Sequence, residues 1–519
     1  MQILDRFIVR IAVLPSVLLM VTCAFGQIGA PVRQAQASSA TQLPLSGRTG
    51  QNGSVTTTEL PVPGTTTSVN TLNPGVQVQG PYAGSAKGKE PFSGKLSLRE
   101  AIERGLRYNL GAVGLSDAVR QARGQSRVTR SALLPNVNGN LSETVQQLNL
   151  QASGLRFNVP QFAGFSIPRV VGPFNYFDLR ATLSQTVVDM TAWNNRRSAA
   201  ENLHASEFSA RDARDLVVLA IGGAYLQVIA AAARVQSARA QLDTANALYQ
   251  QTSQQRAVGL VAQLDVNRSR VQVLTQQQRL ESLGNDLAKQ KINLARMTGL
   301  PPTDLYDIAD DVPFEAVPAI HIEDALKQAS GQRSDLKAAE AQVRAAERAR
   351  AAARAERLPA LSLSADYGAI GMNPAQAHGT FSVVGSLKFP IWQGGRIEGD
   401  IEQAGAALAQ RQAELEDLRA QVEADIRKAF LDLQAARNQV EVARENVQVT
   451  QENLKLTRQR FDAGVSDNLE VVQSQESVAN AELDYINSVF AHNLAKLSLA
   501  RATGQAAENL GQFLTVRQP

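Results

Sequence analysis

The residue types that most often carry chemistry are few in this chain of 519 residues, and they are widely separated. The histidines are His204, His321, His378 and His492, and Cys23 is the only cysteine. Metal sites usually need ligands at short recurring spacings, and a nucleophilic thiol needs a neighbouring base. We therefore predict no metal, no cofactor and no catalytic residue.

Two other kinds of reactive site are also not indicated. Asp310 and Asp311 are adjacent acids, but no nucleophile or histidine accompanies them, which favours a solvated loop. No G-x-x-x-x-G-K string followed by Ser or Thr occurs, so we expect no phosphate loop. A hydrolase is therefore only a distant alternative, and the chain is not expected to be an enzyme.

The composition points away from a compact globular enzyme and from a nucleic-acid-binding protein. Lys and Arg number 52 against 48 Asp and Glu, and the net charge of +4 is spread along amphipathic stretches. Proteins that bind nucleic acid usually present a basic block to the phosphates. Aromatic residues make up only 5% of the chain, which is typical of a helix-rich protein with a thin core.

The first 26 residues are typical of an export signal. Arg6 and Arg10 precede an apolar run over 11–21, and small residues at Ala24 and Gly26 offer a cleavage site. A membrane-spanning helix needs roughly 20 apolar residues, so the shorter run favours removal of the segment over a membrane anchor.

Cys23 offers a second way to process the signal, by attachment of a lipid. Bacterial lipoprotein signals prefer Leu three residues before the cysteine and Gly or Ala directly before it. Here Met20 and Thr22 stand at those positions, so ordinary cleavage is the favoured alternative.

Residues 27–93 are rich in Thr, Ser, Gly, Pro and Gln and contain few large apolar side chains. Such a segment buries too little apolar surface to offset the entropy of ordering it. We expect a flexible low-complexity leader.

Beyond residue 93 the chain contains an internal duplication. Leu-Ala-Arg-Met-Thr-Gly at 294–299 returns as Leu-Ala-Arg-Ala-Thr-Gly at 499–504, an offset of 205 residues. Leu-Leu-Pro at 133–135 returns as Arg-Leu-Pro at 357–359, an offset of 224, so the first copy carries extra residues between these anchors. The predicted divisions are a first repeat at 94–312, a second repeat at 313–508 and a tail at 509–519.

Two-residue periodicity predicts two strands in each copy, because apolar side chains alternate with polar ones. The strands are expected at 361–367 and 381–391 in the second copy and, in the first, at 177–187 and around Val137, Leu141 and Val145. The stretch 157–176, rich in Phe, Gly and Pro, is expected to be the loop between the strands of the first copy.

Strands with one apolar and one polar face suit either a lipid-facing barrel or a soluble hairpin packed on a core. Periodicity alone does not separate the two. Four strands cannot close a barrel wide enough to conduct, so the barrel interpretation also requires an oligomer.

The rest of the chain is predicted to be helix of unusual length. No proline occurs between residues 391 and 517, and apolar or small residues recur mostly three or four apart from Leu415 to Phe461, as in a coiled coil. A helix over 396–460 would extend on the order of 100 Å. The matching helix of the first copy is expected at 193–255, and in each copy a break containing glycine leads to a returning helix.

Several motifs together resemble the TolC-like outer-membrane efflux channels. The helix breaks read Ala-Val-Gly-Leu-Val-Ala at 257–262 and Phe-Asp-Ala-Gly-Val-Ser at 461–466. Phe-Pro-Ile-Trp-Gln-Gly-Gly at 389–395 is similar to the bend at which the last strand of a copy turns into the long helix. The first copy has no such Pro and Gly-Gly bend. The resemblance covers about residues 94–508.

The resemblance implies a mainly α fold with a transmembrane β portion. Three protomers would each give four strands to one barrel in the outer membrane, and a long α-helical barrel would continue it into the periplasm. The implied function is a passive exit duct of a tripartite efflux or type I secretion system. The implied partners are a homotrimer, a periplasmic adaptor protein, an inner-membrane transporter that supplies the energy, and outer-membrane lipid, with no nucleic acid.

The two helix breaks are the expected docking site for the adaptor. The predicted contact residues are Val258, Gly259, Leu260, Ala463, Gly464 and Val465. Glycine permits the tight turn, and apolar residues at an exposed tip favour a protein partner. The alternative is an ordinary glycine helix break without a partner.

Two carboxylates occupy equivalent places beyond these breaks, Asp265 six residues after Gly259 and Glu470 six residues after Gly464. The resemblance implies polar links and acids at the periplasmic aperture, and threefold symmetry would turn each acid into a ring that attracts cations. The family's second acid, three residues after Glu470, is Gln473 here, and Phe461 stands where the family has a tyrosine. We therefore expect a single ring at Glu470 and a closed state held mainly by packing. The alternative is two solvated acids in the first turn of a helix.

A periplasmic coiled-coil scaffold or adhesin stalk is the alternative from a different class. It would use the same long helices but would need no lipid-facing strands. Extraction as a heat-stable trimer with detergent favours the channel, whereas solubility without detergent favours the scaffold.

Overall fold

The computed structural model describes residues 54–62, 71–86, 92, 94–152, 154, 168–302, 306–315 and 321–514. The predicted signal at 1–26, and Cys23 with it, lies outside the described residues. The chain divides into two compact units. The sheet unit contains Leu134–Val188 and Ala360–Lys388, and the helical unit contains Pro44–Leu133, Asp189–Pro359 and Phe389–Pro519.

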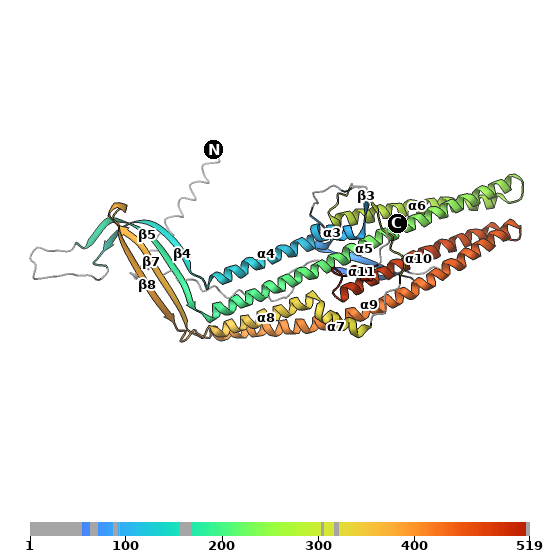
Figure 1. Ribbon diagram of the computed structural model, residues 1–519. Helices are drawn as coiled ribbons and strands as arrows, with labels where there is room; N and C mark the ends of the chain where they lie inside the picture. Colours follow the sequence, from blue (N-terminus) through green and yellow to red (C-terminus); the bar gives the residue numbers. More distant parts are fainter. Residues whose placement is uncertain are drawn as a thin grey trace, which may run out of the picture. The chain divides into compact units, whose positions relative to one another are not determined.

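The sheet unit is one antiparallel sheet with the strand order β4, β5, β7, β8 (Figure 1). Its strands are β4 (Asn136–Asn149), β5 (Val170–Val188), β7 (Ala360–Gly371) and β8 (His378–Lys388). Each copy of the repeat therefore contributes two neighbouring strands, and β4 and β8 are the edges. The four strands expected from two-residue periodicity are confirmed.

β5 is longer than expected, because it begins at Val170 inside the segment 157–176 that was assigned to a loop. Val170 lies opposite Asn149 and Val171 opposite Leu148, beyond an irregularity in β4. Strand pairing satisfies backbone N–H and C=O groups that a loop would leave to water. The loop prediction is therefore wrong at its C-terminal end.

The strand register gathers apolar side chains on one face of the sheet. Leu141 lies opposite Leu179, and Tyr367 lies opposite Phe381. Many of the side chains on this face are half or more exposed in the single chain: Val137, Leu141, Val145, Leu179, Val187, Tyr367, Phe381, Val383 and Leu387. A soluble protein rarely exposes so continuous an apolar surface.

The opposite face of the sheet is mostly polar and contains an ion-paired arginine. Arg180 on β5 pairs with Asp178 at 3.3 Å and with Asp366 on the neighbouring β7. Its guanidinium also donates to Thr380 Oγ1 on β8 at 3.4 Å. One side chain thus ties three strands together from the polar side.

In the helical unit, the helices of the first copy of the repeat recur in the same order in the second copy. The helices of the first copy are α3 (Leu98–Tyr108), α4 (Leu110–Ser131), α5 (Met190–Ala257) and α6 (Gln263–Thr298), and those of the second are α7 (Ile322–Gln332), α8 (Ser334–Ala355), α9 (Arg396–Asp462) and α10 (Asn468–Ala502). Leu98 and Ile322 are 224 residues apart, and Gln263 and Asn468 are 205 apart. The helix starts therefore reproduce both sequence offsets. The short helix α11 (Leu510–Phe513) follows.

The two longest helices begin differently. Asp189 caps α5, because its carboxylate accepts from the backbone N–H groups of Thr191 and Ala192. In the second copy, Gly394 and Gly395 have φ of 61° and 83°, and Gly395 caps α9 without a side-chain hydrogen bond. The Gly-Gly bend and its replacement by an acid are thus two solutions to the same strand-to-helix turn.

Small and apolar residues hold the long helices together. In the middle of α9, the buried residues recur at intervals of three, four or seven: Leu408, Arg411, Leu415, Val422, Ile426, Ala429, Ala436, Val440 and Ala443. This spacing confirms the predicted coiled-coil packing. Helices of this length draw most of their stability from such packing and little from intrinsic propensity.

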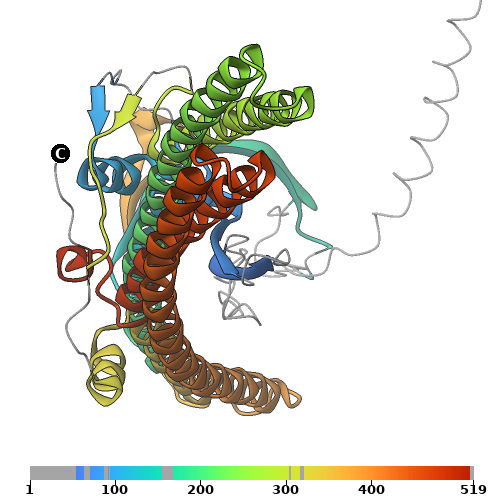
Figure 2. The same cartoon turned by 90° about the vertical axis from the view of Figure 1, so that its right-hand side faces the viewer.

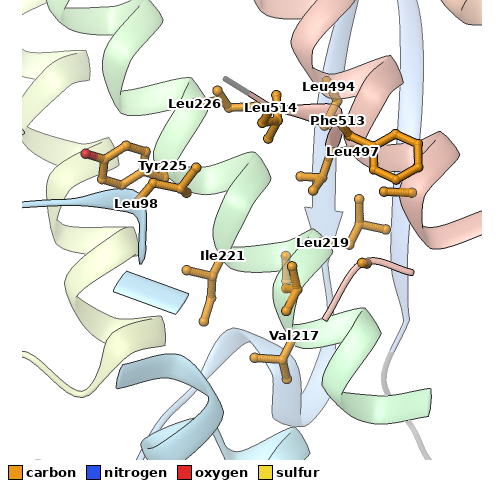
Figure 3. Packing of buried hydrophobic residues seen from close by; sticks show 14 of the residues in the cluster. Leu98, Val217, Leu219, Ile221, Tyr225, Leu226, Leu494, Leu497, Phe513 and Leu514 are labelled. Atoms are coloured by element: carbon orange, nitrogen blue, oxygen red, sulfur yellow. The ribbon is translucent and has the colours of Figure 1, made fainter. Parts of the chain in front are cut away.

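The main core lies where α5 and α10 pack together, and Figure 3 shows part of it. Ile221 and Tyr225 of α5 and Leu494 and Leu497 of α10 are almost completely buried. α5 contains a stretch apolar enough to cross a membrane, and 67% of that stretch is buried inside the protein. Its apolarity is explained by this core.

The expected leader is partly folded. β1 (Val55–Val62) pairs antiparallel with β2 (Thr71–Val78), and η1 (Gly80–Ala83) follows. Val76 and Val78 pack against the main core, and Tyr82 is buried. The prediction of a flexible segment over 27–93 is therefore wrong for these residues, because a few β-branched side chains find a ready apolar surface on the long helices.

Asp310 is not in a solvated loop, contrary to expectation. It follows β6 (Tyr306–Ile308), which pairs in parallel with β3 (Gly94–Leu96). Its carboxylate accepts from the N–H of Leu98 at 2.6 Å and from the hydroxyl of Tyr225 at 3.0 Å, and the residue is 8% exposed. It accepts from the first N–H of α3, whose N-cap residue is Ser97, and joins that helix to Tyr225 of α5, so its role is structural.

A buried group of charges joins the two copies. Arg501 of α10 donates to Asp212 of α5 at 2.5 Å, and Arg333 donates to Asp335 at the start of α8 at 2.6 Å. Burial alone would lower the pKa of Arg501, but Asp212, Asp335 and Asp215 raise it above its ordinary value. The guanidinium therefore stays charged in the core, where each partner matters.

We expect Asp212→Ala to destabilise the helical unit by about 3–5 kcal/mol, because it leaves Arg501 without its closest partner. Denaturation of the detergent-purified protein, followed by circular dichroism, measures the change. The matched control is Asp286→Ala, which removes an exposed carboxylate 4.0 Å from Lys289 and should change stability by less than about 1 kcal/mol. Equal effects of the two substitutions would contradict the assignment.

Candidate functional site at the helix tips

The two helical hairpins, α5–α6 and α9–α10, end in the same local structure (Figure 1). Gly259 and Gly464 have φ of 81° and 73°, in the left-handed region. After α5, the N–H of Leu260 donates to the carbonyl of Gln255 at 2.9 Å; after α9, that of Val465 donates to the carbonyl of Arg460 at 3.0 Å. Both breaks are therefore Schellman caps, which require glycine for the backbone conformation.

The residues around these glycines are apolar and exposed. Val258, Leu260 and Val465 are 72%, 74% and 70% exposed, and Ala463 is also exposed. A Cβ at Gly259 or Gly464 would meet no neighbouring atom. The exposed apolar tips that the sequence predicted are present, and apolar side chains held on a rigid turn are suited to contact with another protein.

A groove beside the tips extends this apolar surface. Its volume is about 360 Å³, and it lies between the first turns of α6 and α10. The lining residues are Leu264, Asn267, Arg268, Val271, Gln272, Leu469 and Val472. Sequence spacing did not predict this groove, because its two walls come from helices about 200 residues apart in the chain.

Asp265 and Glu470 both lie in the first turn of a helix. Asp265 is 3.6 Å from Arg268, and Glu470 accepts a hydrogen bond from Ser466 Oγ at 2.7 Å and lies 3.8 Å from Arg460. The positive end of the helix dipole stabilises both carboxylates. These local contacts account for the acids as helix-start residues, and their arrangement as a ring stays a prediction.

Asn468 links the two hairpins directly and was not predicted. Its side-chain amide donates to the carbonyl of Asp265 at 2.9 Å and to Ser269 Oγ at 2.7 Å, and the residue is 1% exposed. We call this contact the Asn468 link. A polar residue at a helix start usually faces water, so the sequence carried no signal for a buried role.

Phe461 lies in a small apolar cluster close to the link. It packs with Leu248 and Val471 and is 9% exposed. Nearby, Gln251 on α5 donates to the carboxylate of Asp462 at 2.7 Å. The chain therefore holds its two helical hairpins together near the tips by apolar packing and by a few hydrogen bonds.

We expect Asn468→Ala to accelerate amide hydrogen exchange in the first turns of α6 and α10 by about 5–30-fold, since two buried hydrogen bonds are worth about 1–2 kcal/mol. Mass spectrometry of the intact protein measures the change. Asn267→Ala is the matched control, because Asn267 is an exposed asparagine near the start of α6. Exchange that is the same in the two variants would show that the Asn468 link does not hold the hairpins.

Comparison with known proteins supplies the context for this geometry. The model of the outer membrane efflux protein family matches residues 116–300 and 325–505. The chain is 26% identical over 409 residues to the pyoverdine export outer membrane protein OpmQ of Pseudomonas putida, covering 74% of this chain and 81% of the relative.

Solved structures show the same fold. The outer membrane protein VceC of Vibrio cholerae superposes with a TM-score of 0.67 at 20% identity, covering 79% of this chain and 97% of that one. The CmeC outer membrane channel of Campylobacter jejuni superposes with a TM-score of 0.68 at 16% identity, covering 86% and 95%. Both matched segments of the family model include a complete long helical hairpin, and together they span most of the chain, so this protein belongs to the outer membrane efflux protein family.

Proposed function

We propose that the chain works as a homotrimer whose sheet units close one barrel in the outer membrane. The observation that carries this proposal is a four-stranded sheet with an exposed apolar face and two edge strands, β4 and β8, that pair with no further strand among the residues that the structure describes. An unpaired strand edge is not tolerated in hydrocarbon, because its N–H and C=O groups cannot bond to water there. In the membrane, the edge strands must therefore pair with the edge strands of other protomers.

The strand directions permit this closure. Successive strands in the order β4, β5, β7, β8 are antiparallel, so β4 and β8 run in opposite directions. The β8 edge of one protomer can then pair antiparallel with the β4 edge of the next. Two copies would give eight strands, whose interior is filled by side chains, whereas three copies give twelve and leave room for a duct.

The two faces of the sheet fit this arrangement. The apolar face would meet lipid, and the polar face, with Asp178, Arg180 and Asp366, would line water. A coiled-coil scaffold or adhesin stalk would leave the apolar face of the sheet exposed to water, which is unfavourable. Solubility without detergent, or the absence of conductance in planar bilayers, would reject the channel.

Outer membrane efflux proteins are the exit ducts of tripartite systems, and we propose that this chain conducts passively in such a system. An inner-membrane transporter would supply the energy and choose the substrate. OpmQ is named for pyoverdine export. A passive duct accepts what its transporter delivers, so specificity is expected to reside in the transporter.

The apolar tips are the proposed docking surface for the periplasmic adaptor. Leu260 and Val465 project from the two Schellman turns, and the groove lined by Leu264 and Leu469 continues the surface. This combination of exposed aliphatic side chains and an adjacent groove is suited to the end of a helical hairpin of the partner.

Replacing Gly259 and Gly464 together by Val should abolish cross-linking to the adaptor and export, while trimer assembly is retained. A β-branched residue is strained at positive φ and would deform both tips, and no packed atom lies within reach of its Cβ. Site-specific cross-linking and a drug-accumulation assay measure the effect. The control replaces Gly284 and Gly399, two helical glycines with equally open surroundings, and should retain export. Export at the parental level in the tip variant would refute the docking site.

We also propose that Glu470 forms the acidic ring at the periplasmic aperture, because its side chain is 48% exposed whereas that of Asp265 is only 21% exposed. Glu470→Gln should then lower the cation selectivity of reconstituted channels at low salt, because the ring loses its charge. The reversal potential across a salt gradient in planar bilayers measures this. Asp467→Asn, which changes an acid three residues earlier, is the control. An unchanged reversal potential with a normal trimer would leave Glu470 as a helix-start acid only.

A further inference from the structure

The hairpin formed by β1 and β2 packs on one side of the long helices, and the short helix α3 packs on the other. A Cβ placed at Gly105 of α3 would overlap the side chain of Ile221 on α5. A Cβ placed at Gly223 would overlap Val76 of β2. Ile221 and Gly223 are two residues apart on one helix, so they face nearly opposite directions. The layer of long helices therefore separates α3 from the hairpin.

Figure 2 shows which side is which. Within the helical unit the long helices form a curved layer. α3, α7, α11 and the pair β3–β6 lie on its convex side, whereas the hairpin, in dark blue, lies on its concave side. Figure 3 shows the same arrangement from close by, with Tyr225 and Leu98 on one side of α5 and Leu497 of α10 on the other.

The helices are shaped to receive this hairpin. Gly222 and Gly223 stand next to each other in the middle of α5, where each glycine costs about 0.5–1 kcal/mol relative to Ala. Gly222 is needed for the packing of α10, because its Cβ would lie 2.8 Å from Leu497 Cδ2. Gly223 instead leaves room for Val76, which also packs against the main core together with Val78 and Val55.

In a tube built from curved layers, the concave side of each layer is the inside. We infer that the β1–β2 hairpin of each protomer lies inside the helical tube and narrows the tube at the level of Gly223. This inference rests on the proposed trimeric duct. The residues that alternate with the packed valines, Thr56 and Gln77, are exposed in the single chain and would face the water-filled path. The duct would then be narrowed by the chain's own N-terminal segment, in three copies.

Thiol modification in planar bilayers tests this placement. In Gln77→Cys trimers, a positively charged methanethiosulfonate reagent should lower the single-channel conductance in up to three steps, one for each protomer. The control is Arg99→Cys, since Arg99 lies on α3 at the convex side with a side chain that is 89% exposed. Its modification should leave the conductance unchanged, as should treatment of the parent chain, whose only cysteine is Cys23.

A second variant tests the packing itself. A Cβ at Gly223 would lie 3.2 Å from Val76 Cβ, close to the roughly 3.5–4.5 Å found in disulfides. The pair Val76→Cys and Gly223→Cys should therefore form a disulfide within one protomer on oxidation, detectable by mass spectrometry, in trimers that still conduct.

The outcomes separate this inference from the proposed function. Conducting trimers in which modified Gln77→Cys leaves the conductance unchanged, or in which the disulfide does not form, would overturn the placement of the hairpin and leave the duct intact. A parent chain that forms no conducting trimer would overturn the duct itself.

Discussion

The architecture depends on one constraint: backbone hydrogen-bonding groups at the edge of a sheet must find partners where water is absent. In the described part of the chain, the outer edges of β4 and β8 pair with no other strand, and the exposed apolar side chains between these edges are unfavourable in water. In the proposed trimer, pairing between protomers would complete the strand edges, and lipid would cover the apolar face. In the proposed arrangement the width of the barrel would depend on how many protomers close it, and the helices joined to the sheet would take the same symmetry.

Much of the fold could be predicted because it rests on periodicity. The predicted helices 396–460 and 193–255 differ from the observed α9 and α5 by no more than three residues at any end. A heptad-like spacing sustained over nine turns or more without proline leaves no competing structure. The strands were found for the same reason, and the start of β5 was missed because Gly and Pro interrupt its alternation.

The failures have a common physical cause. The packing of the β1–β2 hairpin on the long helices, the burial of Asp310 and the Asn468 link each depend on a partner far away in the sequence. Local composition describes Thr-rich and acidic segments correctly as polar, but tertiary contacts can bury a few polar residues when each hydrogen bond is made. At the candidate site, the glycine caps were predictable from their local motif. The groove and the Asn468 link between the two helical hairpins were not.

The length of α5 has a mechanical consequence. The buried charges at Asp212 lie 45 residues before the helix ends at Ala257, a lever arm of about 70 Å at 1.5 Å per residue. A tilt of about 1° about that point moves the tip by roughly 1 Å, which already stretches a hydrogen bond of normal length beyond its useful range. The Asn468 link is weak, but it acts at the end of this arm. The force needed to resist a given torque is smallest there. A weak contact at the tip can thus resist the same torque as a much stronger contact close to the pivot.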